Sequence, residues 1–349
     1  MTNEWMRPAR LMIDGAKLIR NWRALDELSG PNARCGAAVK ADAYGLGATE
    51  TVRRLHAAGC RDFFVATWQE AEEIDGLTKH ASVSVLDGVL NDDLPIADRS
   101  NAKPMLNSIA QVERWRTTGR PCDVMINSGM NRLGIDPHEA AGIDWHGFDI
   151  DILASHLASA DEDTVRNAEQ LEVFRGAASH VPHRRTSIAN SAGVALSPDY
   201  ACDLTRPGLA LYGGVPRDEL AARIEPVASL SVRVLQCRQI EIGGHVGYNA
   251  TWTASTRTPV AIIAVGYADG YKRAFSNAGQ FFHRGRGLPV IGRVSMDLVA
   301  IDISAAPELR EGDWVGLPLN LPVLTEQSGL SPYELLTGLG SRFDRIWTD

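Results

Sequence analysis

The chain has 349 residues, of which 44% are hydrophobic and 22% charged, as expected of a soluble globular protein with one large domain or two ordinary ones. Its net charge of -8 is spread along the chain without a block of Lys or Arg, which argues against nucleic acid or a membrane surface as partner. The five cysteines are widely separated and show no metal-ligand spacing, and the first residues lack an export signal. We therefore expect reduced thiols, no metal, a cytoplasmic location and a small-molecule partner.

The first two thirds of the chain alternate short apolar runs with helical patterns. An amphipathic helix begins after Asp14, because Leu18, Trp22 and Leu25 would share one face. Eight βα units then predict an α/β fold with a (β/α)8 barrel of the TIM type over residues 9–222, and an open doubly wound sheet is the alternative. The eight apolar runs are 35–40, 62–67, 82–88, 102–107, 122–127, 148–155, 184–190 and 204–213.

The pattern changes beyond residue 223. Residues 226–242, 258–270 and 288–304 have the composition of strands, and glycine-rich turns join them. The sequence therefore predicts a second, mostly β domain over 223–349, with residues 1–8 packing against it.

Polar residues that could take part in catalysis or binding fall at the carboxyl ends of the predicted barrel strands, where barrels bind their ligands. A lysine there can form an imine with an aldehyde cofactor, and pyridoxal phosphate also needs a phosphate cradle and a partner for its ring nitrogen. Each residue alone has an ordinary structural explanation, but together they favour a cofactor site. The residues are Lys40 for the aldehyde, Ser191 and Gly208 for the phosphate, Arg206 for the ring nitrogen, and His156 and Asn190 beside them.

At this point the sequence resembles the alanine racemase family over almost its whole length. The similar motifs are "VKADAYGLG", "SGMNRLG", "SHLASADE", "IANSAG", "RPGLALYG", "VGYNATWTA", "VGYADGY" and "GRVSMD", in the family's order. The resemblance implies an isomerase that interconverts L-alanine and D-alanine on pyridoxal 5'-phosphate, for peptidoglycan synthesis or alanine catabolism. It also implies a homodimer whose active sites lie between the barrel of one subunit and the β domain of the other.

The resemblance assigns roles to individual residues. Lys40 would hold the cofactor as an aldimine and act as the base on one face of the substrate, and Tyr248 of the other subunit would serve the opposite face. His156 would support Arg206 at the ring nitrogen. The remaining cofactor contacts would come from Tyr44, Asn190, Ser191, Gly208 and Leu209, and the substrate contacts from Arg132, Tyr267, Met296 and Asp297.

The proposed chemistry needs residues of these types. Racemisation removes a proton from one face of the α-carbon and returns one to the other, so two different bases spare the substrate from turning over. Arg206 can only donate hydrogen bonds, so it would leave the ring nitrogen unprotonated and the ring a weaker electron sink. Such a ring favours simple proton exchange over transamination.

Several positions depart from the common pattern of the family. Asp42 and Leu46 replace an asparagine and a histidine, and Ser187 replaces a histidine. Ser341 stands in place of a tyrosine, and Met125 in place of a lysine that many members carbamylate.

Three alternatives to an alanine racemase stay open. One is a single-barrel pyridoxal-phosphate homeostasis protein, which would lack the β domain. Another is a decarboxylase of basic amino acids, which would place an acid where Arg206 stands. The third is a broad-specificity or serine racemase of the same fold.

Overall fold

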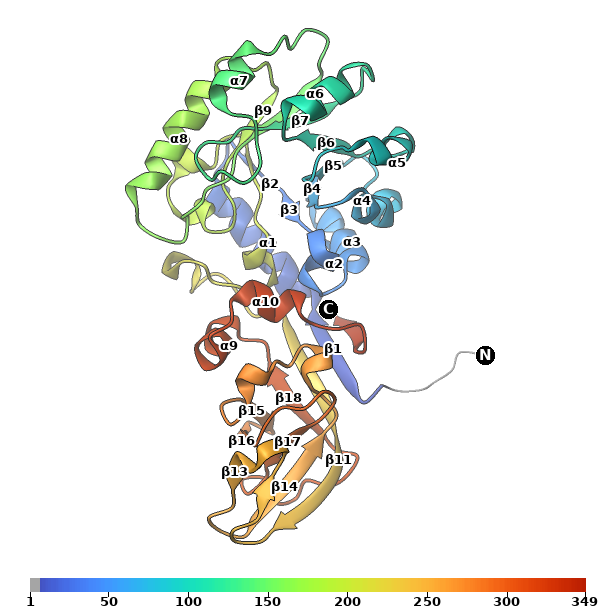
Figure 1. Ribbon diagram of the computed structural model, residues 1–349, viewed down its shortest axis with the longest axis vertical. Coiled ribbons are helices and arrows are strands. Elements are labelled where there is room, and N and C mark those ends of the chain that lie inside the picture. The colour runs from blue at the N-terminus through green and yellow to red at the C-terminus, as the bar shows by residue number, and fades with distance from the viewer. Residues whose placement is uncertain (1–6) are drawn as a thin grey trace. The chain divides into compact units, whose positions relative to one another are not determined.

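The computed structural model describes residues 7–349, and the chain divides into two compact units (Figure 1). One unit is Leu18–Glu225, and the other combines the described residues up to Lys17 with Pro226–Asp349. The predicted domain limits, 9–222 and 223–349, stay a prediction. The expected packing of residues 1–8 falls mainly on residues 1–6, which lie outside the described part of the chain.

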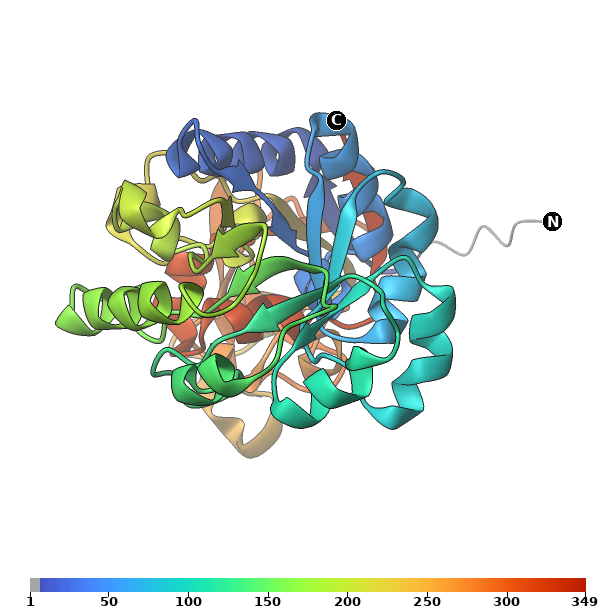
Figure 2. The same ribbon diagram turned by 90° about the horizontal axis from the view of Figure 1, so that it is seen from above.

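The unit formed by Leu18–Glu225 is the predicted barrel. Seven parallel strands pair in chain order, β3-β4-β5-β6-β7-β8-β9, and β10 pairs with β2 (Figure 2). Backbone hydrogen bonds from Asp203 and Arg206 to residues 186 and 189 join β10 to β9, so the eighth run closes the ring and excludes the open sheet. The strands are β2 Arg34–Cys35, β3 Ala37–Ala38, β4 Asp62–Val65, β5 Ser82–Val85, β6 Lys103–Leu106, β7 Cys122–Met125, β8 Ile150–Ala154, β9 Arg185–Ser187 and β10 Leu204–Thr205.

A helix follows each of the first six strand runs and so joins it to the next run. The predicted first helix is present as α1, Gly15–Ser29, where Asp14 accepts the N–H of Lys17 at 2.9 Å and the predicted face is buried. After β9 and β10 the connections contain only short 3-10 turns, among them Gly193–Ala195 and η5 Leu209–Tyr212. The other helices are α3 Ala48–Ala58, α4 Trp68–Ile74, α5 Leu94–Arg99, α6 Ile109–Arg116, α7 Pro137–Gly142 and α8 Val165–Ala178.

Apolar side chains from several strands fill part of the interior of the barrel. Met125 packs there in a buried cluster with residues of neighbouring strands, including Ala38, Phe64 and Met105. Gly36 lies between β2 and β3, where the backbone of the neighbouring strand passes close by. A Cβ on Gly36 would lie 2.8 Å from the carbonyl oxygen of Asp62. The close approach of these backbones therefore requires glycine.

A buried ion-pair network lies near the amino ends of the same strands. The Nζ of Lys103 is 2.8 Å from Asp123 and also contacts Asp151. Arg185 pairs with Asp151 at 2.8 Å and with Asp62 at 2.9 Å. Since conserved chemistry in barrels sits at the opposite, carboxyl ends, we assign this network to strand register and stability.

Lys103→Met is expected to lower the free energy of unfolding by about 3–5 kcal/mol, because it leaves the fully buried Asp123 without its cation. Urea denaturation of the variant and the parent measures the difference. Adding Asp123→Asn should recover part of the loss by removing the uncompensated charge. A loss below about 1 kcal/mol for the single variant, typical of exposed pairs, would contradict the assignment.

The second unit is built on a mostly antiparallel sheet with the order β14-β17-β16-β15-β18-β11-β1-β19. The long strand β11 pairs with β1 and β18 along its first half and with β14 from Val234 onward, with a shift of register between Val234 and Gln236. The sheet therefore curls on itself, because β14 also lies at the end of the strand order. Two short helices, α9 Leu321–Ser328 and α10 Pro332–Thr337, lie between β18 and β19 in the sequence. The strands are β1 Ala9–Asp14, β11 Ala228–Ile240, β12 His245–Val246, β13 Trp252–Thr253, β14 Thr258–Ile263, β15 Gln280–His283, β16 Arg286–Ile291, β17 Val299–Asp302, β18 Trp314–Pro318 and β19 Asp344–Thr348.

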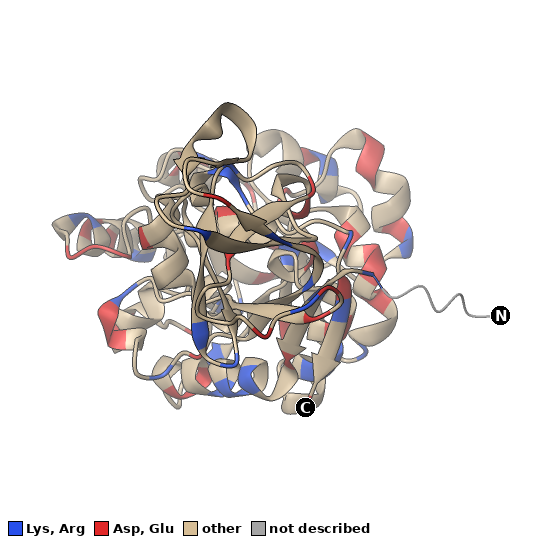
Figure 3. Ribbon diagram, turned by 90° about the horizontal axis from the view of Figure 1, so that it is seen from below, with Lys and Arg blue, Asp and Glu red and all other residues tan. Residues whose placement is uncertain are grey.

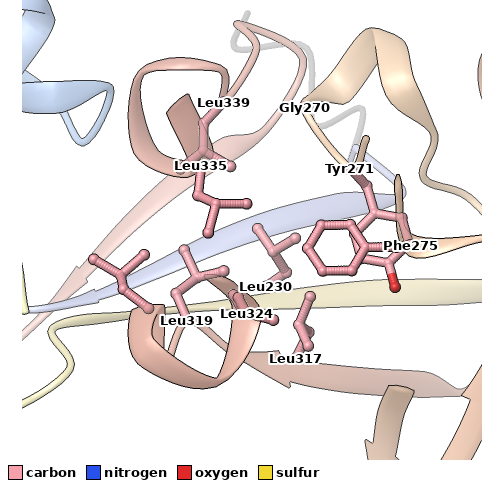
Figure 4. A pocket seen from close by; sticks show the side chains of 10 residues that line it. Leu230, Gly270, Tyr271, Phe275, Leu317, Leu319, Leu324, Leu335 and Leu339 are labelled. Atoms are coloured by element: carbon pink, nitrogen blue, oxygen red, sulfur yellow. The ribbon is translucent and has the colours of Figure 1, made fainter. Parts of the chain in front are cut away.

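A small pocket of this second unit belongs to its core. Its lining is Leu230, Gly270, Tyr271, Phe275, Leu317, Leu319, Leu321, Leu324, Leu335 and Leu339 (Figure 4). Seven leucines and Phe275 have no polar side-chain atom, and Tyr271 supplies the single hydroxyl of this lining, so we assign the pocket to the apolar core.

The charges agree with the expected small-molecule partner. Basic and acidic positions are interspersed along the ribbon without a long run of one sign (Figure 3). Between residues 7 and 349 no helix combines the length and hydropathy needed to cross a bilayer. All five cysteines are free thiols.

Candidate active site

Lys40 begins an unusual turn directly after the first barrel strand. Ala41, Asp42, Ala43 and Tyr44 all have φ between +52° and +56°, so the segment Lys40–Tyr44, labelled α2, contains a left-handed helical turn. Left-handed backbone costs L-residues roughly 1–2 kcal/mol each, and none of the four is glycine. Such strain persists only where surrounding contacts impose it, which is typical of functional sites.

The surroundings of Lys40 favour its neutral amine. Burial and the charge of Arg132 lower the pKa of Lys40, and Arg206 acts in the same direction with a smaller effect. The carboxylates of Asp87 and Glu70 partly offset this effect. A lysine with a lowered pKa presents more of the unprotonated amine that nucleophilic attack requires.

Arg206 is a buried cation without a carboxylate partner. Arg206 directly follows β10, and only 7% of the residue is exposed. No carboxylate within residues 7–349 forms an ion pair with its side chain. Its Nη1 donates to the hydroxyl of Ser187, and its Nη2 donates to the carbonyl oxygen of Ser155 at 2.5 Å. Burial lowers the pKa of Arg206 to about 10, so the side chain stays charged at neutral pH. A buried guanidinium with only neutral oxygen partners calls for a further acceptor.

His156 belongs to the same electrostatic cluster but does not contact Arg206 through a hydrogen bond. Burial and the charges of Arg206, Arg132 and Lys40 lower the pKa of His156 to about 3, which keeps the ring neutral. The side-chain hydrogen bonds of Arg206 go to Ser187 and Ser155, and the support expected from His156 stays a prediction. Ser187 is itself oriented, because its hydroxyl donates to the carbonyl oxygen of Leu204 at 2.5 Å.

The strand ends next to Arg206 form a second group of contacts. The hydroxyl oxygen of Ser191 accepts the N–H groups of Gly208 at 3.0 Å and Ala210 at 3.1 Å, so its own proton is available to donate. A Cβ on Gly208 would overlap the hydroxyl of Tyr44, so only glycine fits there. The ring of Tyr44 lies 4.8 Å from that of Tyr212, between ring centres.

Two further positions complete this group. The side chain of Asn190 accepts the N–H of Gly193 at 2.9 Å, which shapes the turn that presents Ser191. Leu209 is buried at the start of η5.

Of the remaining predicted residues, Arg132 belongs to the barrel unit, where its charge acts on Lys40 and His156, and the others belong to the second unit. Arg132 is exposed in the loop after β7. Tyr248 is 66% exposed in the second unit, on the short turn η7 Tyr248–Ala250. The turn begins after Gly247, whose φ is +77°, and Asn249 is also left-handed at +63°. An exposed phenol on a tight turn is available to a ligand or to another chain.

Tyr267, Met296 and Asp297 come from two loops of the second unit that are bonded to each other. The N–H of Tyr267 donates to the carbonyl of Ser295, and the N–H of Ala268 to that of Met296, both at 3.0 Å. Arg342 then bridges the loops, since its Nε donates to Asp269 at 2.6 Å and its Nη1 to Asp297 at 2.7 Å. Asp297 therefore already has a cationic partner within this chain.

Reasoning from the sequence missed four residues, three of them in the barrel and one, Arg342, in the second unit. Ser155 acts through its backbone carbonyl and Tyr212 through a bond from its hydroxyl to the carbonyl of Ala38 at 2.9 Å, and neither role depends on a motif. Glu70 accepts the N–H of Ala41 at 2.7 Å. Arg342 was the one available signal, because it directly follows Ser341 in the motif that departs from the family.

Comparison with known proteins agrees with this arrangement. Residues 13–216 match the family described as "Alanine racemase, N-terminal domain", and residues 227–347 match "Alanine racemase, C-terminal domain". An alanine racemase of Cereibacter sphaeroides is 39% identical over 347 residues, 97% of this chain and 98% of the relative. A catabolic alanine racemase of Rhizobium johnstonii is 41% identical over 353 residues, 96% of this chain and 93% of the relative.

Solved structures agree as well. The chain is similar to the crystal structure of alanine racemase from Bartonella henselae with covalently bound pyridoxal phosphate, with a TM-score of 0.91 and 32% identity over 98% of this chain and 99% of the other. The biosynthetic alanine racemase of Pseudomonas aeruginosa gives a TM-score of 0.90 and 33% identity, with 99% and 100% covered. The predicted barrel and β domain are thereby confirmed, and the single-barrel alternative is excluded. The chain belongs to the alanine racemase family.

Proposed function

We propose that this protein interconverts L-alanine and D-alanine with pyridoxal 5'-phosphate as cofactor. The observation that carries the proposal is the buried, carboxylate-free Arg206 in one electrostatic cluster with Lys40, whose pKa is lowered. A decarboxylase that relies on a strong electron sink would need an acid at this position, which holds Arg206 here. Among the described residues, the hydrogen-bonding partners of its side chain are neutral oxygens.

The residues of the barrel fit the cofactor. Lys40 offers an amine for covalent attachment, Arg206 offers donors to a ring nitrogen, and the Ser191 hydroxyl has a proton to donate to a phosphate. Tyr44, Asn190, Gly208 and Leu209 would border the phosphate, and His156 the ring. When bound, pyridoxal phosphate supplies an aldehyde for attachment and a ring that withdraws electron density from the α-carbon.

The chain's own residues would move the protons. Lys40 takes or returns a proton through Nζ on one face of the substrate, and Tyr248 does so through its hydroxyl on the other. Arg132 and the backbone of Met296 hold the substrate carboxylate, and Asp297 lies beside them. Tyr267 narrows the entrance, which limits the size of the substrate side chain.

The exposed position of Tyr248 supports a shared site in a homodimer. In that arrangement Lys40 and Tyr248 come from different subunits, and a single chain would be inactive. We place the protein in the cytoplasm, where its D-alanine would enter peptidoglycan synthesis or its alanine would be catabolised.

The direct test incubates the purified protein, supplied with pyridoxal phosphate, with a panel of L-amino acids and follows their chirality. We expect alanine to racemise fastest. Faster racemisation of serine would make the protein a serine racemase of the same fold, and decarboxylation of lysine or arginine would contradict the proposal.

The replacement of a carbamylated lysine by Met125 leads to a prediction about anions. Met125 is buried among apolar residues and cannot carry a negative charge for Arg132. Arg132 is exposed in the single chain and would need an anion only where the assembled site buries it. Asp297 is already paired with Arg342, so we propose that a small solvent anion such as chloride accompanies Arg132 there.

Activity should therefore not respond to bicarbonate, and it should depend on the identity of the small anion at constant ionic strength. Initial rates in chloride, fluoride and sulfate buffers, with and without carbon dioxide stripping, provide the measurement. Loss of activity on stripping, restored by bicarbonate, would show that a lysine elsewhere is carbamylated.

A further inference from the structure

The left-handed turn after Lys40 needs an external contact to hold it. Hydrogen bonds inside the turn, such as Gly45 N–H to the carbonyl of Ala41 at 2.8 Å, define its shape but do not attach it to the barrel. The N–H of Ala41 belongs to the peptide that follows Lys40, and it has a partner 29 residues away in the sequence.

That partner is the carboxylate of Glu70 on α4. One oxygen, Oε1, accepts the N–H of Ala41 at 2.7 Å, and the other, Oε2, accepts the N–H of Ala66 at 2.6 Å, just beyond β4. A single side chain thus joins the Lys40 turn to the neighbouring strand end.

The ordinary role of Glu70 in capping its own helix does not account for both contacts. Thr67 and Glu70 form a capping box at the start of α4, in which Oε2 accepts the N–H of Thr67 at 3.4 Å and Thr67 Oγ1 accepts the N–H of Glu70 at 3.3 Å. The box leaves Oε1 free, and that oxygen binds Ala41.

We propose that Glu70 is a positioning residue for Lys40: its carboxylate fixes the peptide after Lys40 and thereby directs the amine into the site. This inference rests on the proposed function. Glu70 also acts electrostatically, because with Asp87 it raises the pKa of Lys40 against burial, Arg132 and Arg206.

The test uses variants with matched controls on the same helix. Glu70→Ala removes both contacts of the carboxylate. Thr67→Ala breaks the capping box but leaves the hydrogen bond from Ala41 to Glu70. Glu73→Ala removes an exposed carboxylate from the same helix and serves as the charge control. Each protein is freed of cofactor, and the rate of covalent attachment of pyridoxal phosphate is followed by absorbance from pH 6 to 10, together with the melting temperature.

We expect Glu70→Ala to slow attachment at least about tenfold and to move the midpoint of its pH dependence to lower pH, because the variant lacks a carboxylate that raises the pKa of Lys40. Thr67→Ala and Glu73→Ala should attach the cofactor within about twofold of the parent, even where Thr67→Ala melts earlier. If Glu70→Ala does not fold, Glu70→Gln, which keeps the size and one acceptor oxygen, should show the same shift of the midpoint.

The inference would be overturned if the Glu70 variants attached the cofactor at the same rate, and with the same pH midpoint, as Thr67→Ala. Only the cap of the helix would then matter. A parent protein that attaches no pyridoxal phosphate, or attaches it without racemising alanine, would instead contradict the proposed function.

Discussion

Lys40→Ala is expected to abolish both racemisation and covalent retention of the cofactor. The variant removes the only amine assigned to the cluster of Arg132, His156 and Arg206, and with it both the attachment point and one of the two bases. Removal of a single acid–base group typically costs 10²–10⁴-fold, and loss of attachment should add to this. The parent protein, purified with pyridoxal phosphate, should be yellow.

Borohydride reduction followed by peptide mass mapping measures the attachment. The parent should carry the reduced cofactor on the peptide that contains Lys40, and Lys40→Ala should carry none. Lys103→Ala would be a poor control, because Lys103 is part of the buried ion-pair network, so the exposed Lys79 is the better choice as Lys79→Ala. Cofactor trapped on another lysine in Lys40→Ala would refute the assignment.

Tyr248→Phe is expected to reduce racemisation by about 10²–10⁴-fold while leaving the cofactor bound, because only the hydroxyl of an exposed tyrosine is lost. The loss should fall mainly on the direction that begins with L-alanine, if Lys40 serves the opposite face. Exchange of the α-proton with deuterated solvent, measured in single turnovers from each enantiomer, separates the two directions. Equal losses from both enantiomers would mean that another pair of bases acts.

The same two variants test the shared site. Mixing inactive Lys40→Ala with inactive Tyr248→Phe should restore up to about a quarter of the parent activity, because random exchange makes half of the dimers mixed and each mixed dimer has one intact site. Native mass spectrometry confirms subunit exchange. Exchange without recovery of activity would place both residues of a site in the same chain.

The sequence alone was enough to predict the architecture and the chemical class of the site. Apolar runs and the turns between them are local properties, so all eight runs of the barrel could be located from the sequence. Their number favoured a closed ring, but only the hydrogen bonds of the eighth run excluded the open sheet. Lys40 ends the first run, Ser191 follows the seventh and Arg206 lies in the eighth. They could be singled out because the carboxyl ends of parallel strands meet at one face. Family membership, suggested by the motifs, is confirmed by the comparisons.

The partners of these residues could be decided only by the tertiary structure. Arg206 is held by Ser155 and Ser187, which lie 51 and 19 residues before it, because barrel closure brings β8, β9 and β10 together. The motif around His156 suggested a different support, since a sequence does not reveal which atom of a strand end points inward. Likewise Ala41–Tyr44 contains no glycine, so local preferences argue against the left-handed turn that the chain adopts. That conformation depends on contacts such as the one with Glu70, and contact energies between distant segments are absent from any local pattern.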